Sequence, residues 1–140
     1  MKLAITLVIA MGALCSSLPL FAHHSFAAEY DSKKTITIHG VVQKVAWVNP
    51  HAYVWVDAKD ENGKVVTYAF ESLSPNALMR GGWTRNSLKP GDEVTVDGYL
   101  AKDGKPLADG SIHANSKLIT LADGRKVFAG SSADTADPTK

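Results

Sequence analysis

The chain has 140 residues, with 15 Lys and Arg against 14 Asp and Glu, five His and a single Cys. This length suits one domain and is too short for an enzyme with a separate cofactor-binding domain. The formal charge of +1 provides no electrostatic footprint for DNA or RNA, so we expect no nucleic-acid partner. The hydrophobic content of 45% is that of an ordinary folded protein.

Residues 1–22 have the pattern of a cleaved secretory signal peptide. A single positive charge precedes an apolar run at 3–14, and the segment ends at the small residue Ala22. The run is too short for a good membrane anchor, so we expect no stable membrane span after cleavage. Cys15 raises the alternative of a lipoprotein, but a leucine precedes it where lipidation signals have a small residue. We therefore predict cleavage after Ala22 and a location in the periplasm or outside the cell.

Cleavage at this bond changes the chemistry that the chain offers. The mature protein would lose Lys2 and Cys15, which leaves equal numbers of basic and acidic residues and no cysteine. Disulfides, thiol nucleophiles and thiolate metal ligands are then excluded.

Strand patterns dominate the mature chain. Segment 35–48, TITIHGVVQKVAWV, is rich in β-branched residues and predicts a long first strand. Its apolar positions change parity at Gly40, which predicts a bulge or sharp bend there. Segments 51–58 and 64–71 also alternate, and the Asn62-Gly63 pair between them predicts a hairpin.

One short helix interrupts the strands. Ser74 followed by Pro75 predicts its start, and Gly81 predicts its end after about two turns. Two more strands are expected at 93–101 and 111–121, and a tight turn precedes a last short segment at 125–128. We therefore predict an all-β protein with one short helix, folded as a small five-stranded OB-fold-like Greek-key barrel. The alternative is an open β-sandwich.

These patterns divide the chain into four parts. The cleaved signal peptide at 1–22 is followed by an N-terminal segment at 23–34 and by the barrel domain at 35–130. The last residues, 131–140, are small and polar, so we expect a disordered tail.

Four clusters of residues resemble a known family. They are His23–Ala27, Trp47–His51, Trp83–Arg85 with Ser87–Asp92 behind it, and Ala122–Lys126. In this order behind a signal peptide they resemble the domain-of-unknown-function 6152 family of small exported bacterial proteins, over essentially the whole mature chain. The resemblance implies an extracytoplasmic location and brings no established activity.

Histidines suggest a metal site. After cleavage the protein would begin with His23-His24, and an N-terminal His offers its amino group and a ring nitrogen to one ion. Cu(II) prefers tetragonal nitrogen coordination, so copper is the candidate cofactor. His51, at a strand end, is the best further ligand, and His24 is the second. The alternatives are a mobile polar terminus and a His51 that only caps a turn.

Aromatic residues suggest a second kind of site. Exposed aromatic residues on OB-folds bind small molecules or oligosaccharides. The candidate ligand-binding residues are therefore the aromatic Trp47 and Trp83, together with Asn49 and Arg85 beside them in the sequence. Alternating aromatics are also typical of a protein core. His39 and His113 lie within strands and are assigned structural roles.

Catalysis finds no support in the sequence. No GxSxG pattern occurs, and alternation on solvated strand faces explains Glu71 and Asp57 without a paired-carboxylate site. We therefore expect a non-enzymatic exported binding or accessory module that binds Cu(II) through its mature N-terminal His. The alternatives are an interaction module without metal, which packs on an unknown envelope protein, and an OB-like module for a small molecule or oligosaccharide.

Overall fold

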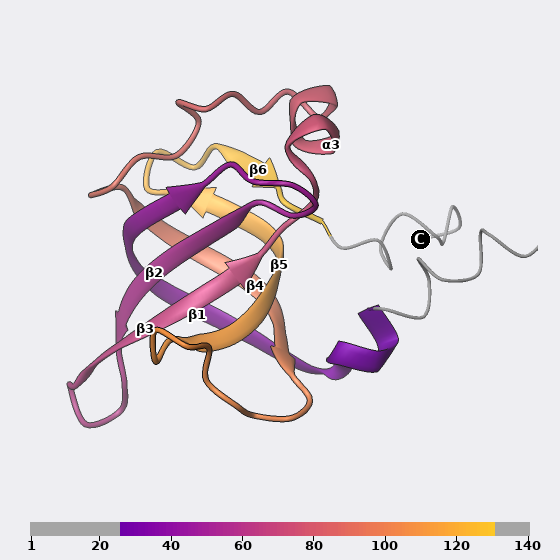
Figure 1. Ribbon diagram of the computed structural model, residues 1–140. Helices are drawn as coiled ribbons and strands as arrows, with labels where there is room; N and C mark the ends of the chain where they lie inside the picture. Colours follow the sequence, from indigo (N-terminus) through magenta and orange to yellow (C-terminus); the bar gives the residue numbers. More distant parts are fainter. Residues whose placement is uncertain (1–25, 131–140) are drawn as a thin grey trace, which may run out of the picture.

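A computed structural model describes residues 26–130 of the chain (Figure 1). A helical turn at 26–29 comes first. The elements that follow are β1 (Tyr30–Ala46), β2 (Tyr53–Lys59), β3 (Val65–Glu71), α3 (Pro75–Arg80), β4 (Glu93–Ala101), β5 (Ile112–Leu121) and β6 (Lys126–Phe128). The predicted signal peptide and the predicted tail at 131–140 lie outside the described residues.

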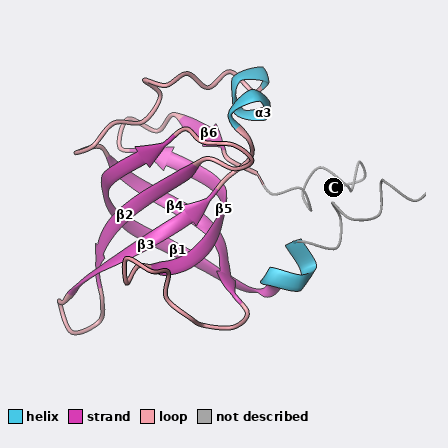
Figure 2. Cartoon of the chain, viewed as in Figure 1, coloured by secondary structure: helices cyan, strands magenta, loops and turns pink. Residues whose placement is uncertain are grey.

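The first five strands close into a barrel. Antiparallel pairing joins β3 to β2, β2 to β1, β1 to β4 and β4 to β5, and a parallel pairing between β3 and β5 completes the ring. A closed ring excludes the open sandwich, so the prediction of a small all-β barrel is confirmed. The short strand β6 extends the sheet beyond β5 as a hairpin, and both helical pieces lie outside the strands (Figure 2).

The barrel interior is filled by alternate residues of its strands. The most deeply buried of these apolar side chains are Val42, Val54, Val56, Phe70, Val96 and Ile119. The connection between β3 and β4 adds Leu78, Trp83 and Leu88 to the same core. Helix α3 begins as predicted, because the Ser74 side chain accepts a hydrogen bond from the Ala77 N–H at 3.3 Å. Apolar side chains thus occupy the interior, so a polar site has to lie on the outer face.

The bend in β1 lies slightly later than the sequence predicts. The pairing of β1 with β2 shifts between Val42 and Lys44, so the bulge is at Gln43 and not at Gly40. Gly40 itself is needed for a close approach, since a Cβ there would lie 2.3 Å from the carbonyl oxygen of Asp57. Val41 comes directly before the core residue Val42, so it faces outward, and it is 42% exposed.

The N-terminal end of β1 is anchored by a second, smaller apolar cluster. β1 begins at Tyr30, five residues before the predicted start at Thr35. Phe26 packs against the rings of Tyr30 and Tyr99, with centroid distances of 5.4 and 5.6 Å. This packing holds the helical turn at 26–29 against the outside of the barrel.

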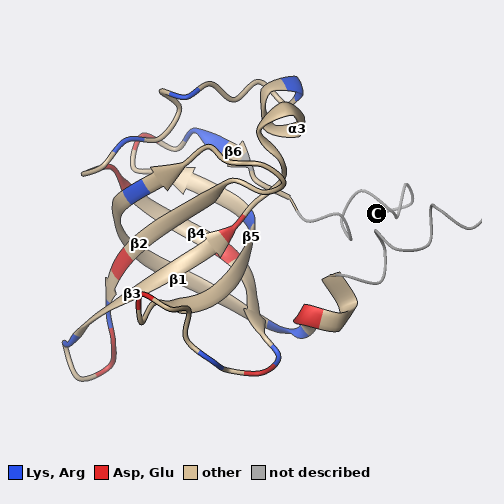
Figure 3. Ribbon diagram, in the orientation of Figure 1, with Lys and Arg blue, Asp and Glu red and all other residues tan. Residues whose placement is uncertain are grey.

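Charged residues of both signs are interspersed over the described part of the chain (Figure 3). Within residues 26–130, no helix has the length and apolar character needed to cross a membrane.

The close approach at Gly40 gives a first testable prediction. We expect Gly40→Ala to lower the free energy of unfolding by about 1–3 kcal/mol, because the added methyl group meets backbone and not a flexible side chain. Gly81→Ala is the comparison: its φ of −80° suits alanine, and its Cβ would lie 3.3 Å from the Leu78 carbonyl oxygen, a tight but longer contact, so we expect a smaller loss. Denaturant unfolding of the two variants checks this, and equal losses would contradict it.

Candidate functional site

Three strands bring polar side chains together on the outside of the barrel. The register of β2 with β3 places Tyr53 opposite Glu71, and the parallel register of β3 with β5 places Glu71 opposite Asn115. His113 lies two residues before Asn115 and therefore on the same face of β5. Phe70 points into the core, so its neighbour Glu71 points outward. The strand closure thus assembles this group from residues far apart in the sequence.

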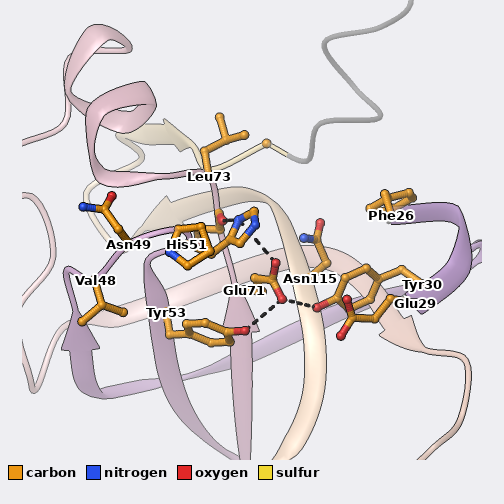
Figure 4. A pocket seen from close by; sticks show the side chains of 13 residues that line it. Phe26, Glu29, Tyr30, Val48, Asn49, His51, Tyr53, Glu71, Leu73 and Asn115 are labelled. Atoms are coloured by element: carbon orange, nitrogen blue, oxygen red, sulfur yellow. Dashed lines mark hydrogen bonds and ion pairs between the residues drawn. The ribbon is translucent and has the colours of Figure 1, made fainter. Parts of the chain in front are cut away.

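Glu71 is buried although it faces outward. Side chains from four segments surround its carboxylate and leave Glu71 8% exposed; they are those of Tyr30, His51, Tyr53 and His113. The Tyr30 hydroxyl donates to Glu71 Oε2 at 2.7 Å, and the Tyr53 hydroxyl donates to the same oxygen at 2.9 Å (Figure 4). The prediction that Glu71 lies on a solvated face is wrong, because strand alternation does not reveal that another segment covers that face.

His51 is held from one side of its ring. Its Nδ1 lies 3.1 Å from the carbonyl oxygen of Ser72 and 3.3 Å from Glu71 Oε1. Both oxygens are acceptors, so Nδ1 carries the proton and donates. In neutral His51 the other nitrogen, Nε2, then has a free lone pair, and it has no hydrogen-bond partner within residues 26–130. The His51 side chain is 43% exposed, which leaves this nitrogen accessible.

His113 is engaged from both sides of its ring. Its Nε2 lies 2.7 Å from the Tyr30 hydroxyl and 3.6 Å from Glu71 Oε2, while its Nδ1 lies 3.8 Å from Glu29 Oε1. Tyr30 donates its proton to Glu71, so its oxygen accepts from His113 Nε2–H. Glu29, Glu71 and His113 are close enough to suggest a metal site. However, the two ring nitrogens face different carboxylates, so His113 is an ion-pair bridge between them.

The hydrogen bonds and charges within this group of residues shift the pKa values of Glu71, His113 and the two tyrosines. Burial acts to raise the pKa of Glu71, but hydrogen bonds from His113, Tyr30 and Tyr53 and the charge of His51 outweigh it, and the pKa lies below its ordinary value. The hydrogen bond to Glu71 raises the pKa of His113 against the effect of burial. Burial and the nearby carboxylate also raise the pKa of both tyrosines. Glu71 is therefore an anion surrounded by protonated donors.

A cavity of about 330 Å³ opens beside Glu71. Its wall combines Glu29, Glu71, His51 and Asn115 with apolar side chains that include Phe26. A largely apolar wall with a few converging polar groups is typical of small-ligand sites. We call this cavity the Glu71 pocket.

The structure separates the residues that the sequence singled out. His51 and Asn49 line the Glu71 pocket. Trp47, Trp83 and Arg85 meet elsewhere: the two indoles are 6.5 Å apart and the Arg85 guanidinium lies 5.9 Å from the Trp47 ring. Trp83 is 4% exposed and belongs to the core, so its indole is not available to a ligand.

The structure leaves two predicted metal ligands untested, and it brings to the site residues that the sequence analysis did not single out. His23 and His24 lie outside the described residues. His39, expected to be structural, hydrogen-bonds to Thr95 on an exposed face, whereas His113 joins the Glu71 network. One local signal was present: two aromatic residues, Phe26 and Tyr30, lie close together in the N-terminal segment, to which the sequence analysis assigned no role.

The Glu71 network predicts how stability depends on pH. A lowered pKa for Glu71 stabilises the fold above the ordinary value of 4.5, and this contribution is lost as the pH falls through the folded-state pKa. A raised pKa for His113 stabilises the fold below its ordinary value of 6.5, and this contribution is lost as the pH rises through the folded-state pKa. We therefore expect the contribution of this pair to be greatest between these two values.

Thermal unfolding across pH 3–9 would measure this dependence in the wild type and in two variants. Glu71→Gln removes the carboxylate that both shifts depend on, so we expect a lower and flatter profile. Glu61→Gln, in the exposed β2–β3 turn, is the control and should follow the wild type. A Glu71→Gln profile parallel to the wild type would contradict the assignment.

Comparison with known proteins gives a family but no activity. No curated protein and no solved structure shows significant similarity to this chain. The family described as "Family of unknown function (DUF6152)" matches residues 12–110. The match includes the clusters at 23–27, 47–51 and 83–92 that carried the resemblance. Since it spans most of the sequence, this chain belongs to the DUF6152 family.

Proposed function

We propose that this protein is an exported, non-enzymatic binding module that takes up Cu(II) at the Glu71 pocket. His51 Nε2 is one ligand in this proposal, and the N-terminal His23 of the mature chain supplies its amino group and a ring nitrogen. The observation that carries the proposal is the orientation of His51.

A histidine that binds a metal through one ring nitrogen usually donates the other N–H to a carboxylate or a backbone carbonyl. His51 has both kinds of partner on Nδ1, in Glu71 and Ser72, and its Nε2 is free. These contacts select the tautomer that a metal ligand needs and hold the ring in one orientation. The ionised Glu71 behind the ring also favours a cation in the pocket.

The course of the chain supports a ligand from the N-terminus. Phe26 lines the Glu71 pocket, and His23 lies three residues before it. Three residues span at most about 10 Å, so the chain length between Phe26 and an N-terminal amino group at His23 allows that group to bind in the pocket. Two or three nitrogen ligands from His23 and His51 suit the tetragonal coordination of Cu(II). Cleavage after Ala22 is part of the proposal, because a longer chain would displace the amino group.

The test uses mature protein secreted by a bacterium without an added N-terminal tag. Intact mass identifies the first residue, and calorimetric titration with Cu(II) at fixed pH gives stoichiometry and affinity. We expect a chain that starts at His23, one ion per chain, and affinity that increases with pH because protons compete for the same nitrogens.

Variants assign the ligands. We expect His51→Ala to abolish tight binding and Glu71→Gln to weaken it by about 10–100-fold, because Glu71 orients the ligand. One residue added before His23 should also weaken binding. His39→Ala is the matched control: this histidine hydrogen-bonds to Thr95 away from the pocket and should leave the affinity unchanged. Equal affinity in His51→Ala and the wild type would overturn the proposal.

A further inference from the structure

We infer that a groove beside Trp55 is a second binding site, and that its ligand is a neutral oligosaccharide. The indole ring of Trp55 would stack on the apolar C–H face of one sugar ring, while Asp57 and Thr67 form hydrogen bonds with its hydroxyl groups. This inference goes beyond the proposed copper site, because it uses other residues and needs no metal.

The groove lies between the first half of β3 and the loop that leads into β5. β3 pairs with β5 only from Tyr68 onward, so within the described chain the residues at 65–67 have this loop beside them and not a strand. The space has a volume of about 430 Å³, which is within the range of small-ligand sites. Polar side chains predominate in its wall, which suits a ligand rich in hydroxyl groups; they are Gln43, Lys64, Thr67, Asp109 and Ser111.

The Trp55 side chain lies across β3 with one face of its ring toward the sheet. Trp55 on β2 is opposite Ala69 on β3, and its indole N–H donates at 2.9 Å to Asp109 Oδ2, in the loop on the far side of β3. Ala69 precedes the core residue Phe70 and so faces outward, yet it is fully buried, which fits an indole ring that passes over it. The other face of the ring is therefore turned away from the sheet.

A lysine covers the outward face of this ring. Lys44 Nζ lies 4.6 Å from the centroid of the Trp55 ring, and Lys44 is exposed. A cation over a solvent-exposed ring is held weakly, so the flexible side chain can move aside for a ligand. A sugar ring has C–H groups on its flat side and hydroxyls at its rim, so it can stack on the indole and keep its rim among polar groups. The displaced ammonium group can then donate to a hydroxyl.

The polar groups of the groove are held in place before a ligand binds. Asp109 accepts a hydrogen bond from the Ser111 N–H at 3.0 Å, which fixes the carboxylate that orients the indole. Asp57 Oδ1 accepts from the Thr67 hydroxyl at 2.6 Å, and Asp57 Oδ2 accepts from the Gln43 amide at 3.2 Å. Each carboxylate oxygen has a second lone pair, so Asp57 can still accept from two sugar hydroxyls. Preorganised side chains lose less conformational freedom on binding.

The charges around the groove favour a neutral ligand. Lys44 and Lys64 are balanced by Asp57 and Asp109, and Asp57 lies two residues after Trp55 on the same outward face of β2. Single-stranded nucleic acids also stack their bases on aromatic rings, but they need a positively charged surface for their phosphates. The two carboxylates oppose such a ligand, so these observations favour a sugar over DNA or RNA.

The experiment uses the same untagged protein as the copper titration, with EDTA added so that metal binding plays no part. Cellohexaose, maltohexaose and chitohexaose are titrated calorimetrically, and an oligothymidylate at physiological ionic strength is the charged comparison. We expect at least one of the oligosaccharides to bind and the oligothymidylate not to bind. Binding of none of the oligosaccharides, or tighter binding of the oligothymidylate, would overturn the inference.

NMR spectroscopy locates the site in the unaltered protein. The indole N–H signal of Trp55 should shift when the oligosaccharide is added, because this ring is the stacking surface, whereas the signals of Trp47 and Trp83 should stay in place. Trp55→Phe, which lacks this N–H, assigns the signal. A shift confined to Trp47, which lies beside Arg85 and does not line the groove, would contradict the location.

Variants test the two kinds of contact. We expect Trp55→Leu to lower the affinity about tenfold or more, and Trp55→Phe to keep part of it because a ring remains. Asp57→Asn keeps the volume but removes the charged acceptor, so we expect a loss of about threefold to tenfold. Trp47→Leu is the matched control and should bind as the wild type does. Thermal unfolding verifies that each variant is folded, and wild-type affinity in a folded Trp55→Leu variant would refute the stacking role.

His51→Ala separates this inference from the proposed function. The variant removes the proposed copper ligand, and we expect it to bind the oligosaccharide as the wild type does. A wild type that binds the oligosaccharide but no copper would overturn the proposed function and leave this inference standing. A wild type that binds copper but none of the oligosaccharides would overturn this inference alone.

Discussion

The ionised carboxylate of Glu71, buried under the N-terminal segment, is the interaction on which the site depends. A buried charge is costly unless hydrogen bonds and opposite charges compensate for the lost water. Tyr30, Tyr53, His51 and His113 provide that compensation, and they come from four separate segments of the chain. The carboxylate therefore joins the N-terminal cover to the barrel, and loss of any one donor leaves part of the charge unpaired.

The barrel itself explains why a pocket lies on its outer surface. Its interior is filled by apolar side chains, so no internal space remains for a ligand. β3 and β5 are paired over four residues only, from Tyr68 to Glu71 on β3. This short parallel pairing closes the ring and also sets His113 and Asn115 beside Glu71. The outer face of a strand pair is normally flat and wet, and the helical turn at 26–29 gives this one a wall.

The two histidines beside Glu71 illustrate how packing assigns different chemistry to the same residue type. His113 is largely buried, and both of its ring nitrogens are engaged by polar partners, which favours the protonated form. His51 is anchored through Nδ1 alone and keeps Nε2 accessible. A metal needs a neutral ring with a free nitrogen, so the same carboxylate supports an ion pair on one side and a potential ligand on the other.

Local sequence patterns determined the strands, the hairpin at Asn62-Gly63 and the helix start at Ser74, because each depends on residues close together in the chain. Alternation also showed that Glu71 and Phe70 face opposite sides of their strand. Only the tertiary structure decided that the side of Glu71 is covered, since this needs the packing of Phe26 on Tyr30 and Tyr99. The register that brings His113 and Asn115 to Glu71 is likewise a long-range pairing, which no spacing in the sequence encodes.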